Sequence, residues 1–397
     1  MDEFENLEKI FLNLNKQNFS NFSVYFCINQ PKSWWDKEEQ IHICNNNLKS
    51  IDFINKIKNN YKFQIHLIDR SSKEKAWSEK NQGVGWARKT LMDYISNISN
   101  ENDIIISLDA DTQYDSNYFQ LISEYFQKNT SIDCISIPYY HPLNTDDNAN
   151  KAILRYEIYM RYYLLNLFRI NNPYSFSALG SAIAFRISSL NKIGGFSPKK
   201  SGEDFYFLQK MVKYKGIGIW LNSKVYPEAR FSNRVFFGTG PAMIKGNTGD
   251  WNSYPIYSMT LFDKIKEFFN LAPTLFKNNI ETPLDSFFKS IEERNQLFDK
   301  LRKNNKDIEH FVKALYDYFD GLRILQFLKQ NNEVGNDSLN LQLFLREYGN
   351  TEINDLIKDD FNLESTSIIE LNEIRDYLCK LEDLKRKEIF YSTWKTN

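Results

Sequence analysis

The sequence has few cysteines, few histidines and no long apolar run, and each shortage argues against a class of protein. Its four cysteines form no CxxC pair, so their spacing indicates neither a zinc site nor a disulfide framework. The four histidines do not cluster and no G-x-S-x-G motif is present, so a serine hydrolase has no support. No run approaches the roughly 18 apolar residues of a transmembrane helix.

An excess of charge of one sign is also missing. Lys and Arg total 50 and Asp and Glu total 51, which gives a formal net charge of -1. This balance gives no electrostatic reason to expect nucleic acid or a strongly anionic membrane as a partner. The start, MDEFENLEKI, lacks the basic and apolar stretches of a signal peptide. We therefore expect a cytoplasmic protein whose membrane association is at most peripheral.

The residues that are present suffice for a packed core in two domains. The chain has 397 residues, of which 42% are hydrophobic and 15% aromatic. Strands are expected where short apolar runs precede turns, at residues 22–28, 62–68, 103–108 and 134–138. Their alternation with helical patterns favours an α/β domain with a mostly parallel sheet flanked by helices, over residues 1–254. Residues 255–397 show helical spacing alone, which predicts an all-helical domain.

The sequence DIIISLDADTQYD indicates a ligand site at the end of a buried strand. Asp109 and Asp111, at positions i and i+2 of extended chain, point to the same side, where their repulsion is relieved by a cation. Mg²⁺ or Mn²⁺ accepts such oxygen ligands and bridges to phosphates. A solvated Asp-rich turn is the simpler alternative for this motif alone. A calcium loop fails, because Tyr114 and Gln120 stand where Gly and Glu are needed.

A second acidic segment, SGEDFYFLQKM, allows two interpretations. Ser201 as an N-cap with Asp204 three residues on resembles a capping box, and taken alone this structural role is favoured. In the other interpretation, Asp204 faces a cleft and acts as a general base on an acceptor hydroxyl. A helix N-terminus lowers a carboxyl pKa, so burial or the acceptor has to compensate.

Two further segments carry arginine and glycine. In NQGVGWARKTLMDYI (81–95) a glycine turn enters a helix, and Arg88 can pair with a diphosphate or with a site aspartate. Position 88 is Arg, so the segment is no dinucleotide fingerprint. The segment 230–251, with Arg230 and Arg234, suits either a loop that closes over a phosphate-bearing donor or a linker between domains.

Seven segments follow one another in a characteristic order: FSVYFCINQP, IHLIDRSS, NQGVGWAR, IIISLDADT, a G-S-x-x-x-x-R segment, KIGGF and GED. Together they resemble glycosyltransferase family 2, over roughly residues 22–240. The resemblance implies the GT-A fold, Rossmann-like, and transfer of a sugar from a nucleotide-diphosphate donor, of UDP type, to a glycan or lipid-linked acceptor hydroxyl. It implies an inverting, Mn²⁺- or Mg²⁺-dependent reaction in glycan or polysaccharide synthesis. The helical C-terminal part lies outside the resemblance, and the sequence does not indicate an oligomeric state.

The resemblance also implies roles for individual residues. These are Asn29, Asp69, Arg88, Asp109 and Arg234 in binding the nucleotide sugar; Asp109 and Asp111 in holding the metal; Gly180 and Ser181 on the acceptor side; and Asp204 as catalytic base with Glu203 beside it.

Two departures from the family pattern bear on these roles. Cys27 stands where the first strand often has a proline-containing stretch. Some members of the family use a histidine after the GED segment as a further metal ligand, and this chain has no histidine between His141 and His310. Arg230 or Arg234 can instead supply positive charge to the diphosphate. Two other functions use the same fold: a sugar nucleotidyltransferase, which would release pyrophosphate, and a non-catalytic scaffold that binds nucleotide sugars.

Overall fold

The computed structural model describes residues 2–199, 201–233 and 235–394 as two compact units. Unit 1 combines residues 1–150 with 176–244, and unit 2 combines 151–175 with 245–397. These bounds differ from the expected division into residues 1–254 and 255–397, because a helix within the first half belongs to unit 2. The roles of catalytic and accessory domain remain predictions.

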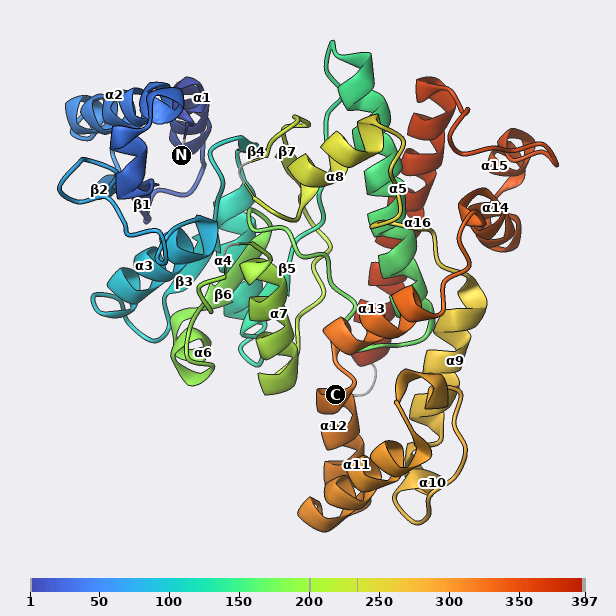
Figure 1. Ribbon diagram of the computed structural model, residues 1–397. Helices are drawn as coiled ribbons and strands as arrows, with labels where there is room; N and C mark the ends of the chain where they lie inside the picture. The colour runs from blue at the N-terminus through green and yellow to red at the C-terminus, as the bar shows by residue number, and fades with distance from the viewer. Residues whose placement is uncertain (1, 200, 234, 395–397) are drawn as a thin grey trace. The chain divides into compact units, whose positions relative to one another are not determined.

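Unit 1 is a mixed α/β structure (Figure 1). Its strands are β1 (Ser23–Asn29), β2 (Gln64–Arg70), β3 (Ile104–Ser107), β4 (Thr112–Tyr114), β5 (Cys134–Ser136), β6 (Ile183–Arg186) and β7 (Val225–Pro227). Its helices are α1 (Phe4–Asn15), α2 (Ile41–Ile57), α3 (Val84–Ser96), α4 (Tyr118–Lys128), α6 (Ile187–Lys192) and α7 (Glu203–Tyr214), and α8 (Thr239–Asn247) begins in it. Four of the strands lie where the apolar runs predict them.

The strands form three small sheets, and the prediction of a mostly parallel sheet is wrong for the described residues. β1 pairs with β2 in parallel. The second sheet has the order β3-β6-β5, with β6 antiparallel to both neighbours, and the third pairs β4 with β7 antiparallel. In the second sheet the cause is β6 (IAFR), which follows all four predicted strands in the sequence but lies between β3 and β5 in the sheet, antiparallel to both.

Aromatic packing fixes α7 against the β3-β6-β5 sheet. Phe185 of β6 lies 4.7 Å from Phe207 of α7, and Phe207 stacks on Phe196 at 4.1 Å between ring centroids. All three side chains are fully buried. Burial of such rings contributes about 1.5–3 kcal/mol each, which makes the position of the α7 N-terminus relative to the sheet well defined.

Unit 2 is all-helical, as expected for the C-terminal part. Its helices are most of α5 (Asp147–Arg169), the end of α8, α9 (Met259–Asn270), α10 (Ala272–Leu275), α11 (Ile291–Asn304), α12 (Ile308–Tyr318), α13 (Gly321–Gln330), α14 (Asp337–Tyr348), α15 (Thr351–Leu356) and α16 (Ile368–Trp394). Apolar residues recur at helical spacing from Phe311 to Leu325, as in one continuous helix. The structure divides it, because Asp320 accepts a hydrogen bond from the Arg323 N–H and caps a new helix, α13.

Buried charges join α5 to α16, which lie side by side in Figure 1. Arg161 donates to Glu157 on its own helix, at 2.6 Å, and to Glu382 of α16. Arg386 also binds Glu382, at 2.8 Å, and Arg375 binds Glu157, at 3.4 Å. Asp376 accepts from Arg375 at 2.8 Å. We call these six residues the α5–α16 cluster.

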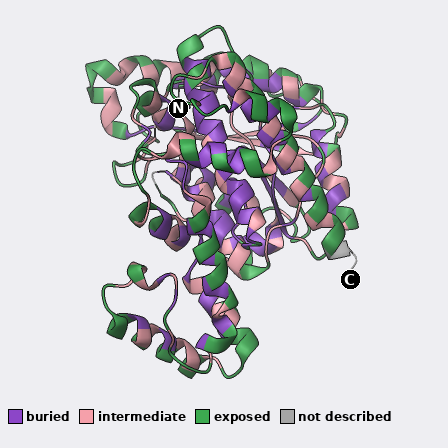
Figure 2. Ribbon diagram, turned by 90° about the vertical axis from the view of Figure 1, so that its right-hand side faces the viewer, coloured by how far each residue is buried: buried purple, intermediate pink, exposed green. Residues whose placement is uncertain are grey.

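Most helices are buried on one side only, and α5 is an exception. In Figure 2 many helices carry buried residues on one side and exposed residues on the other, as amphipathic segments do. α5 is different, because nearly every side chain from Ala152 to Phe168 is buried or half-buried. Within the described ranges, no helix has both the length and the apolar character required to cross a bilayer.

Candidate active site

A buried arginine connects the two acidic segments of unit 1. Arg88 of α3 donates to Asp109, which follows β3, at 2.6 Å, and its other terminal nitrogen donates to Glu203, the first residue of α7. Only 9% of the Arg88 side chain and 2% of the Glu203 side chain are exposed, against 42% for Asp109. Burial lowers the pKa of Arg88, but the two carboxylates outweigh it, so that the pKa is raised. Arg88 therefore stays charged and draws both segments together.

Gly180 makes room for this arginine. A Cβ atom at position 180 would lie 2.0 Å from one terminal nitrogen of Arg88. Any larger residue would therefore displace the guanidinium from its partners. Ser181, the next residue, is buried. The acceptor-side role of both residues remains a prediction.

Asp204 has the electrostatic character of a general base. The side chain is half-buried at the start of α7, next to Glu203. Burial and the Glu203 carboxylate raise the pKa of Asp204 to about 7, and the charge of Arg88 and the Phe205 N–H only partly oppose this. Burial thus outweighs the helix terminus. A carboxyl group with a pKa near neutral pH accepts a proton efficiently and still ionises.

Among the described residues of this segment, the structure does not show the capping box, which was the alternative interpretation. Helix α7 begins one residue later than that motif requires, with Gly202 as N-cap at φ 73°, a left-handed conformation that favours glycine. Asp204 accepts the Phe205 N–H at 2.8 Å instead. The buried Ser201 hydroxyl has no hydrogen-bond partner among the described residues. Asp204 is therefore not committed to a reciprocal cap.

A second arginine binds the other aspartate of the acidic pair. β4 begins directly after Asp111 and pairs with β7, so the chain after β7 runs beside Asp111, whose carbonyl accepts the Glu228 N–H at 3.0 Å. Arg230 then donates to the Asp111 carboxylate at 2.6 Å and, with the same nitrogen, to Glu3. Burial lowers the pKa of Arg230, but the Asp111 and Glu3 carboxylates outweigh burial, so that the pKa is raised. Arg234 lies outside the described residues.

The acidic pair suits a divalent cation in type but supplies few ligands. Carboxylate oxygens are hard donors, as Mg²⁺ and Mn²⁺ require. Asp109 and Asp111 are each bound to an arginine, and in the part of the chain that the structure describes no three acidic, histidine or cysteine side chains gather as a metal-binding group. A cation at this pair would need further ligands from donor phosphates and water.

Asn29 and Asp69 lie together at another edge of unit 1. Parallel pairing places Ile28 beside Asp69 and Asn29 beside Arg70, at the C-terminal ends of β1 and β2. The buried Asn29 Oδ1 has no partner among the described residues, so it can accept a hydrogen bond from a ligand. Asp69 accepts bonds from the backbone and hydroxyl groups of Ser71 and Ser72, and these bonds lower its pKa although burial opposes them. Its oxygens are thus largely engaged within the turn.

The comparisons with known proteins bear on this site. Residues 104–245 match the family model described as Glycosyl transferase family group 2. The chain contains a glycosyltransferase family 2 domain. The enzyme is therefore a transferase of the glycosyltransferase type, as the resemblance predicted. The matched segment of this glycosyltransferase includes Asp109, Asp111, Glu203, Asp204 and Arg230. A search of curated proteins found no match.

Sequence reasoning missed two residues that support the site of this glycosyltransferase. The hydroxyl of the buried Tyr114 accepts the Asp109 N–H at 3.3 Å and so supports the turn that carries the acidic pair. Glu3, from outside the matched segment, binds Arg230. Tyr114 stood in the motif itself, as an aromatic residue within an Asp-rich turn. Glu3 had no local signal.

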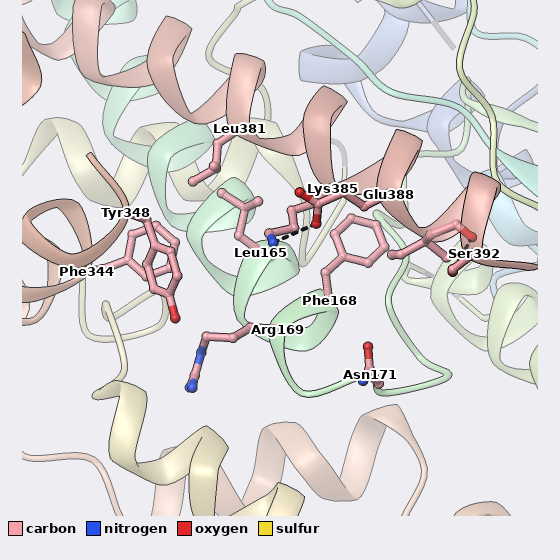
Figure 3. Close-up of a pocket in the computed structure, with 11 residues that line it drawn as sticks. Leu165, Phe168, Arg169, Asn171, Phe344, Tyr348, Leu381, Lys385, Glu388 and Ser392 are labelled. Carbon is pink, nitrogen blue, oxygen red and sulfur yellow. Dashed lines mark hydrogen bonds and ion pairs between the residues drawn. The ribbon is translucent and has the colours of Figure 1, made fainter. Parts of the chain in front are cut away.

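A pocket of about 340 Å³ lies in unit 2, and none of the predicted site residues is among those that line it (Figure 3). Apolar side chains of α5, α14 and α16 line much of it, including Leu165, Phe344 and Leu381. Its cations already have partners, since Lys385 binds Glu388 at 2.8 Å and Arg169 binds Asp263. This pocket therefore offers no uncompensated charge to a ligand.

Proposed function

We propose that this glycosyltransferase moves a sugar from a nucleoside-diphosphate donor, of UDP type, to an acceptor hydroxyl with inversion at the anomeric carbon. The observation that supports it best is Asp204, a carboxyl group with a pKa raised to about 7, next to the buried Arg88 cluster and within the matched segment. We further propose that unit 1 has the GT-A fold and that the acceptor is a glycan or a lipid-linked saccharide.

The proposed reaction is a single displacement. The Asp204 carboxylate takes the proton of the acceptor hydroxyl as the acceptor oxygen bonds to the anomeric carbon. The bond from that carbon to the diphosphate oxygen breaks, and its electrons leave with the nucleoside diphosphate. Arg88 offsets part of the negative charge of Glu203 and Asp109, which reduces their repulsion of the incoming donor. Arg230 binds Asp111 and is proposed to face the diphosphate.

We propose that Asp109 and Asp111 hold Mn²⁺ or Mg²⁺ together with the donor. When bound, such an ion neutralises charge that develops on the leaving diphosphate. For this to happen Asp111 has to exchange part of its contact with Arg230 for the ion. The same exchange directs the guanidinium towards the phosphates, which it recognises in the same bidentate way as a carboxylate.

Release of nucleoside diphosphate tests the proposal. The purified chain, incubated with a panel of nucleotide sugars, is expected to release nucleoside diphosphate from one of them, with a requirement for Mn²⁺ or Mg²⁺ that Asp111→Ala abolishes. The anomeric configuration of the product, read by NMR, tests inversion. Full activity of Asp111→Ala would contradict the metal site. Pyrophosphate release from a nucleoside triphosphate and a sugar phosphate would indicate a nucleotidyltransferase instead.

A further inference from the structure

Helix α1 lies outside the segment that matches the family, yet the residue before it reaches the Asp111–Arg230 pair. One terminal nitrogen of Arg230 donates both to Asp111, at 2.6 Å, and to Oε1 of Glu3. The other oxygen of Glu3 accepts from the amide of Asn6, at 2.6 Å. Asn6 is buried, so Glu3 is oriented by a fixed group on the helix that follows it.

Independent contacts attach α1 to the strand that follows Asp111. The Asn13 amide donates to the carbonyl of Tyr114, the last residue of β4, and the Gln17 amide donates to the carbonyl of Asp115, both at 2.8 Å. The side-chain oxygen of Gln17, Oε1, accepts the Phe119 N–H at 3.2 Å. The strand that begins after Asp111 is therefore bound to the C-terminal end of α1.

Apolar packing holds the same helix along its length. Leu7, Ile10, Phe11 and Leu14 form its buried side, and Phe11 packs on Phe26 of β1 with ring centroids 5.3 Å apart. Contacts at the start, the middle and the end thus fix α1 relative to Asp111 and Arg230. A residue at the start of this helix can act on the site with little conformational cost.

We propose that Glu3 is a positioning residue for Arg230 and that α1 is thereby part of the donor site. Asp111 alone would hold the guanidinium only until a metal ion or the donor engages that carboxylate. Glu3 retains its charge-assisted hydrogen bond and keeps the guanidinium beside the site, where it faces the donor diphosphate. This inference rests on the proposed function, and its ligand is a nucleoside diphosphate.

Binding of UDP in the presence of Mn²⁺, measured by calorimetry, tests the inference in four proteins: wild type, Glu3→Gln, Arg230→Gln and the double variant. Glu3→Gln keeps the size of the side chain and removes its charge, and we expect it to weaken UDP binding about tenfold. Because Glu3 acts through Arg230, the double variant is expected to bind no more weakly than Arg230→Gln. In turnover, Glu3→Gln should raise KM for the donor and leave kcat nearly unchanged.

Glu5→Gln is the matched control, since Glu5 is exposed on the same helix and should bind UDP as the wild type does. Thermal melting at the wild-type temperature verifies that α1 stays docked in each variant. Wild-type affinity in Glu3→Gln, or losses that multiply in the double variant, would overturn the inference and leave the proposed function intact. A wild-type protein that binds no nucleoside diphosphate and releases none would overturn the proposed function, and the inference with it.

Discussion

Both units contain a buried arginine shared between carboxylates, and the two clusters differ in their balance of charge. In unit 1, Arg88 faces Asp109, Glu203 and the adjacent Asp204, which is one arginine for three acids among the described residues. In unit 2, the α5–α16 cluster has three arginines and three acids among the described residues. Burial, together with the acidic excess of unit 1, raises the pKa of Asp204, whereas the equal numbers of arginines and acids in the α5–α16 cluster compensate one another.

The difference indicates which buried charges serve chemistry and which serve packing. A balanced cluster on two long helices specifies their pairing and gains little net energy over an apolar contact, while loss of one member is costly. A cluster with an excess of carboxylates lowers the free energy of unfolding when all of them are ionised. Such clusters are found at active sites, where the reaction uses the raised pKa of one carboxyl group. Four predictions test this contrast, beginning with the largest expected effect.

Asp204→Asn is expected to lower kcat by roughly 100- to 10,000-fold, the usual contribution of a general base. The melting temperature should stay the same or rise, because the variant removes a carboxylate whose ionised form is unfavourable in the folded state. Nucleoside diphosphate release and thermal melting measure the two effects. Asp93→Asn, which alters an exposed pair with Lys89, is the control and should change neither. Wild-type turnover in Asp204→Asn would remove it from the mechanism.

Arg161→Met is expected to lower the free energy of unfolding by about 3–5 kcal/mol, because Glu157 and Glu382 both lose a buried partner. Urea denaturation measures the change. Arg346→Met breaks an exposed pair with Asp359 in the same unit and should cost less than about 1 kcal/mol. If the two variants were equally stable, the α5–α16 cluster would not hold the helices together.

Gly180→Ala is expected to cost about 1–3 kcal/mol of stability and to reduce turnover, since the added Cβ displaces Arg88 from Asp109. Urea denaturation and nucleoside diphosphate release measure both. In an Arg88→Ala background the collision is absent, so the same change should add little. A full additional loss in that background would show that the space at Gly180 serves another group.

The rate of sugar transfer is expected to rise about tenfold per pH unit below pH about 7 and to level off above it, as the Asp204 carboxyl group ionises. Stability should change in the opposite direction. A carboxyl pKa raised in the folded state contributes stability at low pH that is lost as pH rises from about 4 to about 7. A rate profile at saturating donor and urea denaturation across this range measure both. A flat rate profile would contradict Asp204 as the base.

The fold was predictable where the signal was local. Four strands follow apolar runs that end in turns, and α16 follows a long helical pattern. β6 gave no such signal, because IAFR is almost wholly buried without alternation and its antiparallel pairing depends on partners distant in sequence. The same limit applies to unit bounds, since the place of α5 in unit 2 depends on residues more than 200 positions away.

The candidate site divides in the same way. Asp109, Asp111 and Asp204 stand in short motifs at ends of strands and helices, and pairing of Arg88 with a site aspartate was among the expectations. Glu3 could not be predicted, because its contact with Arg230 spans 227 positions and α1 reads as an ordinary amphipathic helix. Electrostatics also required the structure, since burial and the neighbouring Glu203 carboxylate are what raise the pKa of Asp204 at a helix start, where the helix terminus alone would lower it.

The pairing of α5 with α16 has a consequence for biosynthesis. Arg161 and Glu382 lie 221 positions apart. At the roughly 5–20 residues per second of translation, α5 leaves the ribosome some ten to forty seconds before its partner helix exists. During that interval the nascent chain exposes a helix whose side chains from Ala152 to Phe168 are buried or half-buried in the folded protein, and this is the stage at which we expect it to need a chaperone.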